Sequence, residues 1–113
     1  MIHGVGIDVV DIDRFKQSLE RTPGLEIKLF TDAERSKSIQ SLAARFAAKE
    51  ALVKALNAEN GILWHEVEVV NLEGGKPGFI FCGAVADLVD GAIAHLSISH
   101  DAGIATAIVI VER

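Results

Sequence analysis

The segment from Arg45 to Lys54 carries charged side chains where an amphipathic helix would be apolar. At about 100° per residue, Arg45 and Lys49 fall inside the apolar arc, and Glu50 and Lys54 lie at its edge, one turn apart. Because charges beside an apolar stripe are costly without partners, they could line a cleft for a phosphorylated ligand. Alternatively, Glu50 and Lys54 form a surface pair worth ~0.2–0.5 kcal/mol, while the other two extend their charged ends into water.

A second carboxylate, Asp8, lies in an alternating segment at residues 3–10 that predicts a strand with its aliphatic side chains on the opposite face. Gly4 and Gly6 share the face of Asp8, so other groups can approach it closely. Asp8 on a strand and Glu50 on a helix suit Mg²⁺, which takes one or two carboxylates together with water and substrate phosphate. The alternative is that Asp8 caps a turn or the helix that begins near Asp11.

The segment 97–101 contains serine, histidine and aspartate, the residue types of nucleophilic catalysis. Adjacent residues on a strand point to opposite faces, so Ser99 and His100 cannot form the serine–histidine hydrogen bond that this mechanism needs. We therefore reject a catalytic triad. Phosphate contacts suit these side chains better, and a purely structural role is the alternative.

The elements that would position these residues predict an α+β domain with a largely antiparallel sheet packed with a long helix. Apolar spacing and alanine content predict that helix over 41–56, and Thr31 to Glu34 has the form of a capping box. The predicted order is a strand at 3–10, a helix ending at Pro23-Gly24, a helix from Thr31, the helix 41–56, a hairpin of strands 66–72 and 78–82, a helix around 85–92, and strands 94–100 and 104–112.

Size and composition narrow the class of protein. The chain has 113 residues, of which 50% are hydrophobic and 24% charged, as expected for one globular domain over residues 1–113. A single cysteine, Cys82, excludes an intramolecular disulfide, and a net charge of −5 argues against general nucleic-acid binding. Because no secretory leader and no apolar run of ~20 residues is recognised, we expect a soluble cytoplasmic protein with no nucleic-acid or membrane partner.

Together these segments resemble the holo-acyl-carrier-protein synthase family, the small trimeric type of 4'-phosphopantetheinyl transferase. The resemblance runs nearly from end to end, and its most specific part is the Arg-Phe-Ala-Ala-Lys-Glu-Ala element with its spacing from Asp8. The segments that carry it are residues 4–10, 30–34, 45–51, 54–56, 75–77 and 97–101.

The resemblance implies the 4'-phosphopantetheinyl transferase fold and a magnesium-dependent enzyme of fatty acid biosynthesis. It would transfer 4'-phosphopantetheine from coenzyme A to a serine of apo-acyl carrier protein and release adenosine 3',5'-bisphosphate. Asp8 and Glu50 would bind the metal, Lys54 would stabilise charge on the leaving phosphate, and Glu50 would accept the serine proton, directly or through bound water. The residues implied to contact coenzyme A are Arg45, Lys49, Lys54, Ser99 and His100, with Gly61 and Pro77 shaping the pocket.

The first predicted helix carries a stripe of Arg14, Ser18 and Arg21, and the resemblance implies that this helix meets the carrier protein. An acidic partner would give the stripe a use, with Arg14 the first candidate and Arg21 the second. Solvated arginines are the alternative. The resemblance also implies a homotrimer with active sites between subunits. After Leu56, however, residues 57–60 stand where relatives usually place glycine, so the loop before Gly61 should differ.

Two other readings stay open. The chain could be a non-catalytic trimeric module that binds coenzyme A or a nucleotide, or it could be a domain excised from a larger synthase. The first predicts binding without turnover.

Overall fold

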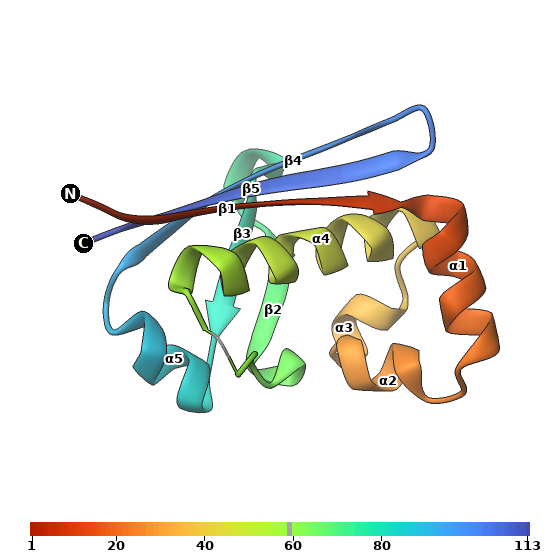
Figure 1. Cartoon of the computed structure of the whole chain (residues 1–113), viewed down its shortest axis with the longest axis horizontal. Helices are drawn as coiled ribbons and strands as arrows, with labels where there is room; N and C mark the ends of the chain where they lie inside the picture. Colours follow the sequence, from red (N-terminus) through yellow and green to blue (C-terminus); the bar gives the residue numbers. More distant parts are fainter. Residues whose placement is uncertain (59) are drawn as a thin grey trace.

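The long helix α4 (Ile39–Leu56) lies beneath a three-stranded antiparallel sheet in the computed structural model, which describes residues 1–58 and 60–113 (Figure 1). The sheet has the order β1-β5-β4, formed by β1 (Ile2–Asp11), β5 (Ile104–Glu112) and β4 (Ile93–Asp101). The other elements are α1 (Ile12–Arg21), α2 (Leu25–Leu29), α3 (Asp32–Arg35), the 3₁₀ turns η1 (Trp64–Glu66) and η2 (Glu73–Gly75), β2 (Val67–Asn71), β3 (Pro77–Phe81) and α5 (Gly83–Val89).

The α+β class and the predicted order of strands and main helices are confirmed. The capping box is also confirmed, because the Thr31 hydroxyl accepts from the Glu34 N–H while the Glu34 carboxylate accepts from the Thr31 N–H. Two features differ from the prediction. The strands form two sheets, since within residues 1–58 and 60–113 β2 and β3 pair only with each other. Helix α2 was not predicted, because five residues after Pro23-Gly24 are too few to show a helical period.

The contact between β1 and α4 depends on glycine. A Cβ atom on Gly4 would lie 1.9 Å from the carbonyl oxygen of Ala55, and one on Gly6 would lie 1.9 Å from that of Ala51. Any larger residue would push the strand away from the helix, so these glycines and the alanines facing them set the spacing of the two backbones. Asp8 lies on the same face of β1, which confirms the predicted close approach and brings its carboxylate to the edge of α4.

The aliphatic face of β1 points outward, away from α4. Antiparallel sheets usually carry polar residues on their solvent face, but here the outer face of β1 and part of that of β5 are apolar, whereas β4 adds polar side chains such as Ser97 and Ser99. The large hydrophobic side chains of the outer face are between 38% and 61% exposed; they are Val5, Ile7, Val9, Ile93, Ile104 and Ile108.

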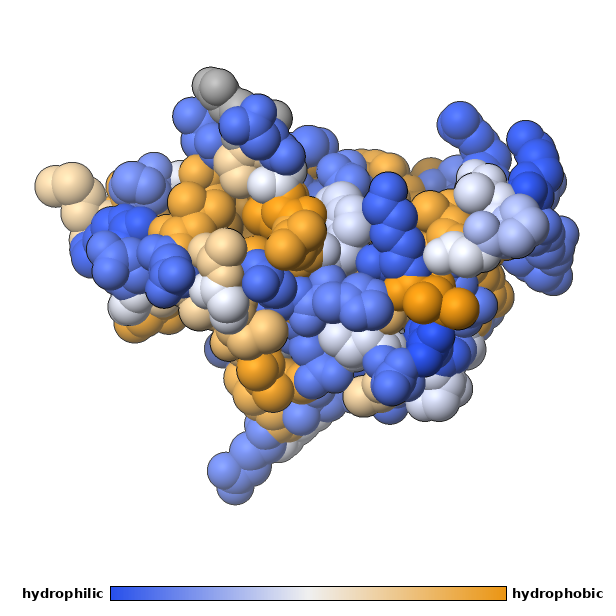
Figure 2. Space-filling model, turned by 90° about the horizontal axis from the view of Figure 1, so that it is seen from below, coloured by the Kyte–Doolittle hydropathy of each residue, from blue (hydrophilic) through white to orange (hydrophobic). Residues whose placement is uncertain are grey.

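The side of the molecule opposite the sheet has a different surface. Figure 2 shows that hydrophobic residues there lie in patches separated by hydrophilic ones. Among residues 1–58 and 60–113, no helix combines the length and the apolar composition needed to cross a bilayer.

Candidate active site

Asp8 and Lys54 form an ion pair at the junction of β1 and α4. The Lys54 Nζ donates to Asp8 Oδ1 at 3.2 Å and to the carbonyl oxygen of Ile7 at 2.8 Å. The Lys54 side chain is 52% exposed and that of Asp8 is 18% exposed, so the pair opens to solvent. Lys54 therefore pairs with Asp8 and not with Glu50 within the described part of the chain. The helix cap is also accounted for without Asp8, because Asp11 caps α1 by accepting from the Arg14 N–H.

Glu50 faces the same open cavity as Asp8. This cavity, of about 290 Å³, also has Arg14, Ser18 and Phe15 of α1 in its wall. Helix α1 follows directly from β1 and packs beside α4. Glu50, a residue of α4, therefore lies in the same wall as the residues of β1 and α1. We call this space the Asp8 cavity. It unites the predicted metal ligands with two of the three residues predicted to meet a carrier protein.

Burial raises the pKa of Glu50, and the nearby charge of Asp8 raises it further, while Lys54 opposes these effects. Two carboxylates that share a partly buried cavity repel each other, and a divalent cation would relieve that repulsion. Mg²⁺ needs no more than one or two protein carboxylates when water and substrate phosphate complete its shell. The residues present therefore fit the metal that the sequence predicts.

A second cavity of about 370 Å³ lies on another side of α4. Its wall includes Arg45 and Ser41 of α4, Asn71 and Pro77 from the β2–β3 hairpin, and His100 of β4. Arg45 is only 7% exposed and donates to the Ser41 hydroxyl, but its buried Nε–H has no acceptor among the described residues. A buried guanidinium with an unused donor suits an anionic ligand. We call this space the Arg45 cavity.

The prediction that Lys49 contacts the cofactor is corrected by the structure. Its side chain is 0% exposed, and its Nζ donates to Glu34 Oε1 at 2.7 Å, to the Leu29 carbonyl oxygen at 2.8 Å and to the Trp64 carbonyl oxygen at 3.2 Å. An ammonium group has three donors, and all three are used inside the chain. The angular argument correctly placed Lys49 among apolar residues but assigned its partner to a ligand instead of to Glu34.

Ser99 and His100 lie on opposite faces of β4, which confirms that they form no catalytic pair. His100 faces the Arg45 cavity, whereas Ser99 faces the outer side of the sheet beside Ile7 and Thr106. Within one chain, Ser99 is therefore separated from the other predicted coenzyme A contacts. Gly61 is in the wall of neither cavity; it has a φ of 75° and follows a loop of which Glu59 lies outside the described residues.

The predicted stripe on α1 is exposed, but its members differ. Arg14 and Ser18 reach the Asp8 cavity, whereas the Arg21 guanidinium donates to Gln17 Oε1 at 3.1 Å. Arg14 is thus the arginine nearer to the carboxylates.

Two features were not predicted from the sequence. One is the place of Asn71 in the wall of the Arg45 cavity, for which its spacing gives no signal, and the other is the burial of Glu34. The available signal for Glu34 was Lys49 itself, because a lysine predicted within an apolar arc needs an acidic partner.

Known proteins are similar to this chain in sequence and in fold. Residues 4–107 match the 4'-phosphopantetheinyl transferase superfamily. The chain is 56% identical over 115 residues to a holo-[acyl-carrier-protein] synthase of Clavibacter michiganensis, covering 99% of this chain and 97% of that protein. It is 53% identical over 116 residues to the holo-[acyl-carrier-protein] synthase of Leifsonia xyli, covering 100% and 98%.

Among solved structures, the chain is similar to an ACPS–CoA complex from Chronobacterium ammoniagenes. The TM-score is 0.85 and the sequence identity 30%, with 96% of each chain covered. The similarity in sequence and in fold therefore extends over nearly the whole chain. The chain belongs to the 4'-phosphopantetheinyl transferase superfamily.

Proposed function

We propose that this protein transfers 4'-phosphopantetheine from coenzyme A to a serine of apo-acyl carrier protein, giving holo-acyl carrier protein and adenosine 3',5'-bisphosphate, in cytoplasmic fatty acid biosynthesis. The observation that carries the proposal is the placement of Asp8 and Glu50 in the wall of one open cavity, with Lys54 bonded to Asp8 beside it. The Arg45 cavity, on another side of the same helix, offers a subsite for an anionic group of the ligand. A similar solved protein is a complex with coenzyme A.

The chemistry follows from the groups in the Asp8 cavity. The serine oxygen attacks the phosphorus that bears pantetheine, a new O–P bond forms, and the P–O bond to the adenosine bisphosphate breaks. Glu50 is the candidate to accept the serine proton, directly or through bound water, because its carboxylate lies in the wall of the same cavity as Asp8. Lys54 uses two donors within the described chain, so its third N–H can donate to the leaving phosphate.

Asp8 and Glu50 would hold Mg²⁺, which when bound supplies positive charge against the coenzyme A pyrophosphate. Asp8 is well placed for this role because its backbone is fixed, with the Thr106 hydroxyl donating to its carbonyl oxygen at 3.0 Å. Arg45, with Pro77 and His100 beside it, would bind a phosphate and the adenosine end of the cofactor.

A homotrimer is the second part of the proposal. Its support is the exposed aliphatic patch on the outer face of the sheet, formed by Val5, Ile7 and Val9 of β1 with Ile108 of β5, since a contiguous patch of this kind marks an interaction surface. The Asp8 and Arg45 cavities have no wall residue in common, and Glu50 lies about 140° around α4 from Arg45. An active site formed by the Asp8 cavity of one subunit and the Arg45 cavity of its neighbour would use both. Sedimentation should give three times the chain mass of 12.1 kDa, and a monomeric wild-type protein would contradict this part.

The activity test uses the purified protein, coenzyme A, Mg²⁺ and apo-acyl carrier protein, with the carrier weighed by mass spectrometry. We expect the carrier to gain one phosphopantetheine group. Asp8→Ala and Glu50→Ala should each abolish the gain without unfolding the protein, and Asp13→Ala, an exposed carboxylate of α1 outside the cavity wall, is the control. A wild-type protein that binds coenzyme A without modifying the carrier would be a non-catalytic binding module.

A further inference from the structure

Glu34 has more bonds than its role as a helix cap requires. Its carboxylate is 1% exposed; Oε1 accepts from the Thr31 N–H at 3.0 Å and from the Lys49 Nζ at 2.7 Å, and Oε2 accepts from the Val69 N–H at 2.9 Å. A capping box needs only the bond to Thr31. The other two bonds join α4, through Lys49, to β2, through Val69.

The bond to Val69 uses an edge of β2 that is not paired with any strand in the described part of the chain. The Leu72 N–H and the Glu66 carbonyl oxygen both bond toward β3, and the direction of these groups alternates along an antiparallel strand. The Val69 N–H, three residues from each, therefore points away from β3. Glu34 takes the place of a neighbouring strand there, and it holds the hairpin against α3 and α4.

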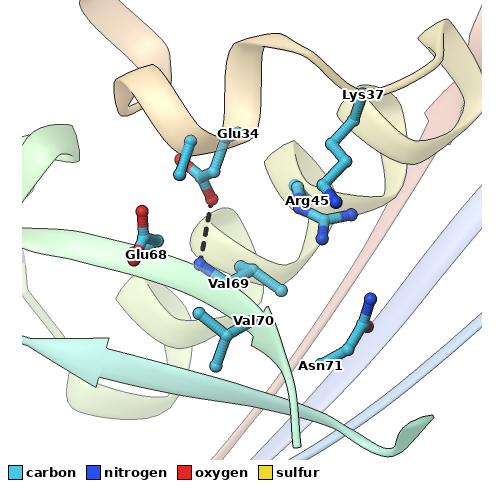
Figure 3. Close-up of a pocket in the computed structure, with 8 residues that line it drawn as sticks. Glu34, Lys37, Arg45, Glu68, Val69, Val70 and Asn71 are labelled. Carbon is cyan, nitrogen blue, oxygen red and sulfur yellow. Dashed lines mark hydrogen bonds between the residues drawn. The ribbon is translucent and has the colours of Figure 1, made fainter.

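The two bonds of Glu34 lead directly to the two walls of the Arg45 cavity. Arg45 lies one helical turn before Lys49, or about 6 Å along α4. Asn71 lies two residues beyond Val69, or about 7 Å along β2. Figure 3 shows Glu34 bonded to Val69 between α3 and β2, with Arg45 and Asn71 facing the adjoining space of about 260 Å³.

We propose that Glu34 is a positioning residue for the nucleotide end of coenzyme A: its carboxylate, bonded to Lys49 and Val69, sets the separation of Arg45 and Asn71. The proposal rests on the proposed function, because it takes coenzyme A as the ligand of the Arg45 cavity. Glu34 acts through Lys49 and Val69 and not by contact with the ligand, because its side chain is 1% exposed and is not in the wall of the Arg45 cavity.

The test is Glu34→Asp, which keeps the charge and shortens the side chain by one methylene, about 1.5 Å. The dissociation constant for adenosine 3',5'-bisphosphate, measured by calorimetry, should rise about tenfold, as expected when one charged hydrogen bond in the cavity weakens. The KM for coenzyme A should rise with it, while kcat and the KM for carrier protein change by less than about twofold. A purely structural role would lower the amount of folded enzyme and leave these constants unchanged.

Glu66→Asp is the matched control. Glu66 Oε1 also accepts from a backbone N–H, that of Val85 at 3.2 Å. Glu66 is in the wall neither of the Arg45 cavity nor of the adjoining space. This variant should bind the bisphosphate as the wild type does. An unchanged dissociation constant in folded Glu34→Asp would overturn the proposal, and so would an equal rise in both variants. If the wild type transfers no phosphopantetheine, the proposed function fails, but the binding comparison still decides the role of Glu34.

If Glu34→Asp does not fold, hydrogen exchange of the wild-type protein gives the answer. Adenosine 3',5'-bisphosphate should slow exchange of the Val69 amide more than exchange of the Val85 amide. If binding depends on the hydrogen bond between Val69 and Glu34, the bound ligand must in turn stabilise that bond. Equal slowing at both amides would overturn the proposal.

Discussion

Two lysines of helix α4 form ion pairs with carboxylates of other elements, and the two pairs differ in burial and in geometry. In the Lys49–Glu34 pair the side chains are 0% and 1% exposed and the atoms are 2.7 Å apart. In the Lys54–Asp8 pair they are 52% and 18% exposed and 3.2 Å apart. The two lysines are five residues apart, which turns them about 140° from each other around the helix. One pair is buried in the interior, whereas the other is open to solvent, with Asp8 in the wall of the Asp8 cavity.

The difference lies in which donors and acceptors are already satisfied. Burial lowers the pKa of Lys49, and the bond to Glu34 opposes that effect, so the lysine depends on its acceptors to keep its charge. The ammonium of Lys54 keeps a donor available. The charge of the Asp8 carboxylate raises the cost of ionising its neighbour Glu50. The closed pair stabilises the fold, whereas the open one leaves groups available for a ligand.

The largest expected effect comes from breaking the closed pair. Lys49→Met should lower the free energy of unfolding by about 3–5 kcal/mol, because it leaves the Glu34 carboxylate buried without a counter-charge. Urea denaturation followed by circular dichroism measures this loss. A loss smaller than that of Lys54→Met would show that the closed pair does not hold the fold together.

The matching change in the open pair, Lys54→Met, should affect turnover strongly and the free energy of unfolding little. Its effect on unfolding should stay within about 1 kcal/mol, since the pair is solvent-exposed. The turnover number should fall by about 10²–10³, as found when one donor to a developing charge is removed. Steady-state transfer to carrier protein measures the second effect. Near-normal turnover would remove Lys54 from the reaction.

Much of this contrast could be predicted from the sequence. The angular positions along residues 41–56 placed Lys49 inside the apolar arc and Glu50 and Lys54 at its edge, and the burial of these residues agrees. Local rules also predicted the capping box at Thr31 and the glycine contacts of β1, because both depend on residues near in sequence or on side-chain size.

The partners of these residues could not be predicted from the same rules. Glu34 lies 15 residues from Lys49 and Asp8 lies 46 residues from Lys54, so the choice of partner is made by the tertiary fold. The same limit applies to Asn71, which reaches the Arg45 cavity only because the β2–β3 hairpin folds toward α4.

A smaller effect, on thermal stability, should arise from Glu50 in the Asp8 cavity and should depend on pH. The folded state raises the pKa of Glu50, so ionisation of Glu50 disfavours folding increasingly as pH rises through that raised value. In metal-free protein at neutral pH, Glu50→Gln should therefore raise the thermal midpoint by a few degrees while abolishing transfer. Below the ordinary pKa of glutamate both states are neutral, and the difference should vanish. A midpoint that falls at neutral pH would contradict the repulsion between Glu50 and Asp8.

The smallest expected effect concerns the rim of the Asp8 cavity. Arg14 is exposed and lies in its wall, so Arg14→Ala should raise the KM for carrier protein by up to about fivefold, the size expected for one exposed charge pair. The KM for coenzyme A should not change, and the effect should shrink at high salt because the attraction is screened. Lys16→Ala, an exposed cation of the same helix outside the cavity wall, is the control. Equal effects of the two substitutions would mean that net charge, rather than the position of Arg14 beside the carboxylates, guides the carrier protein.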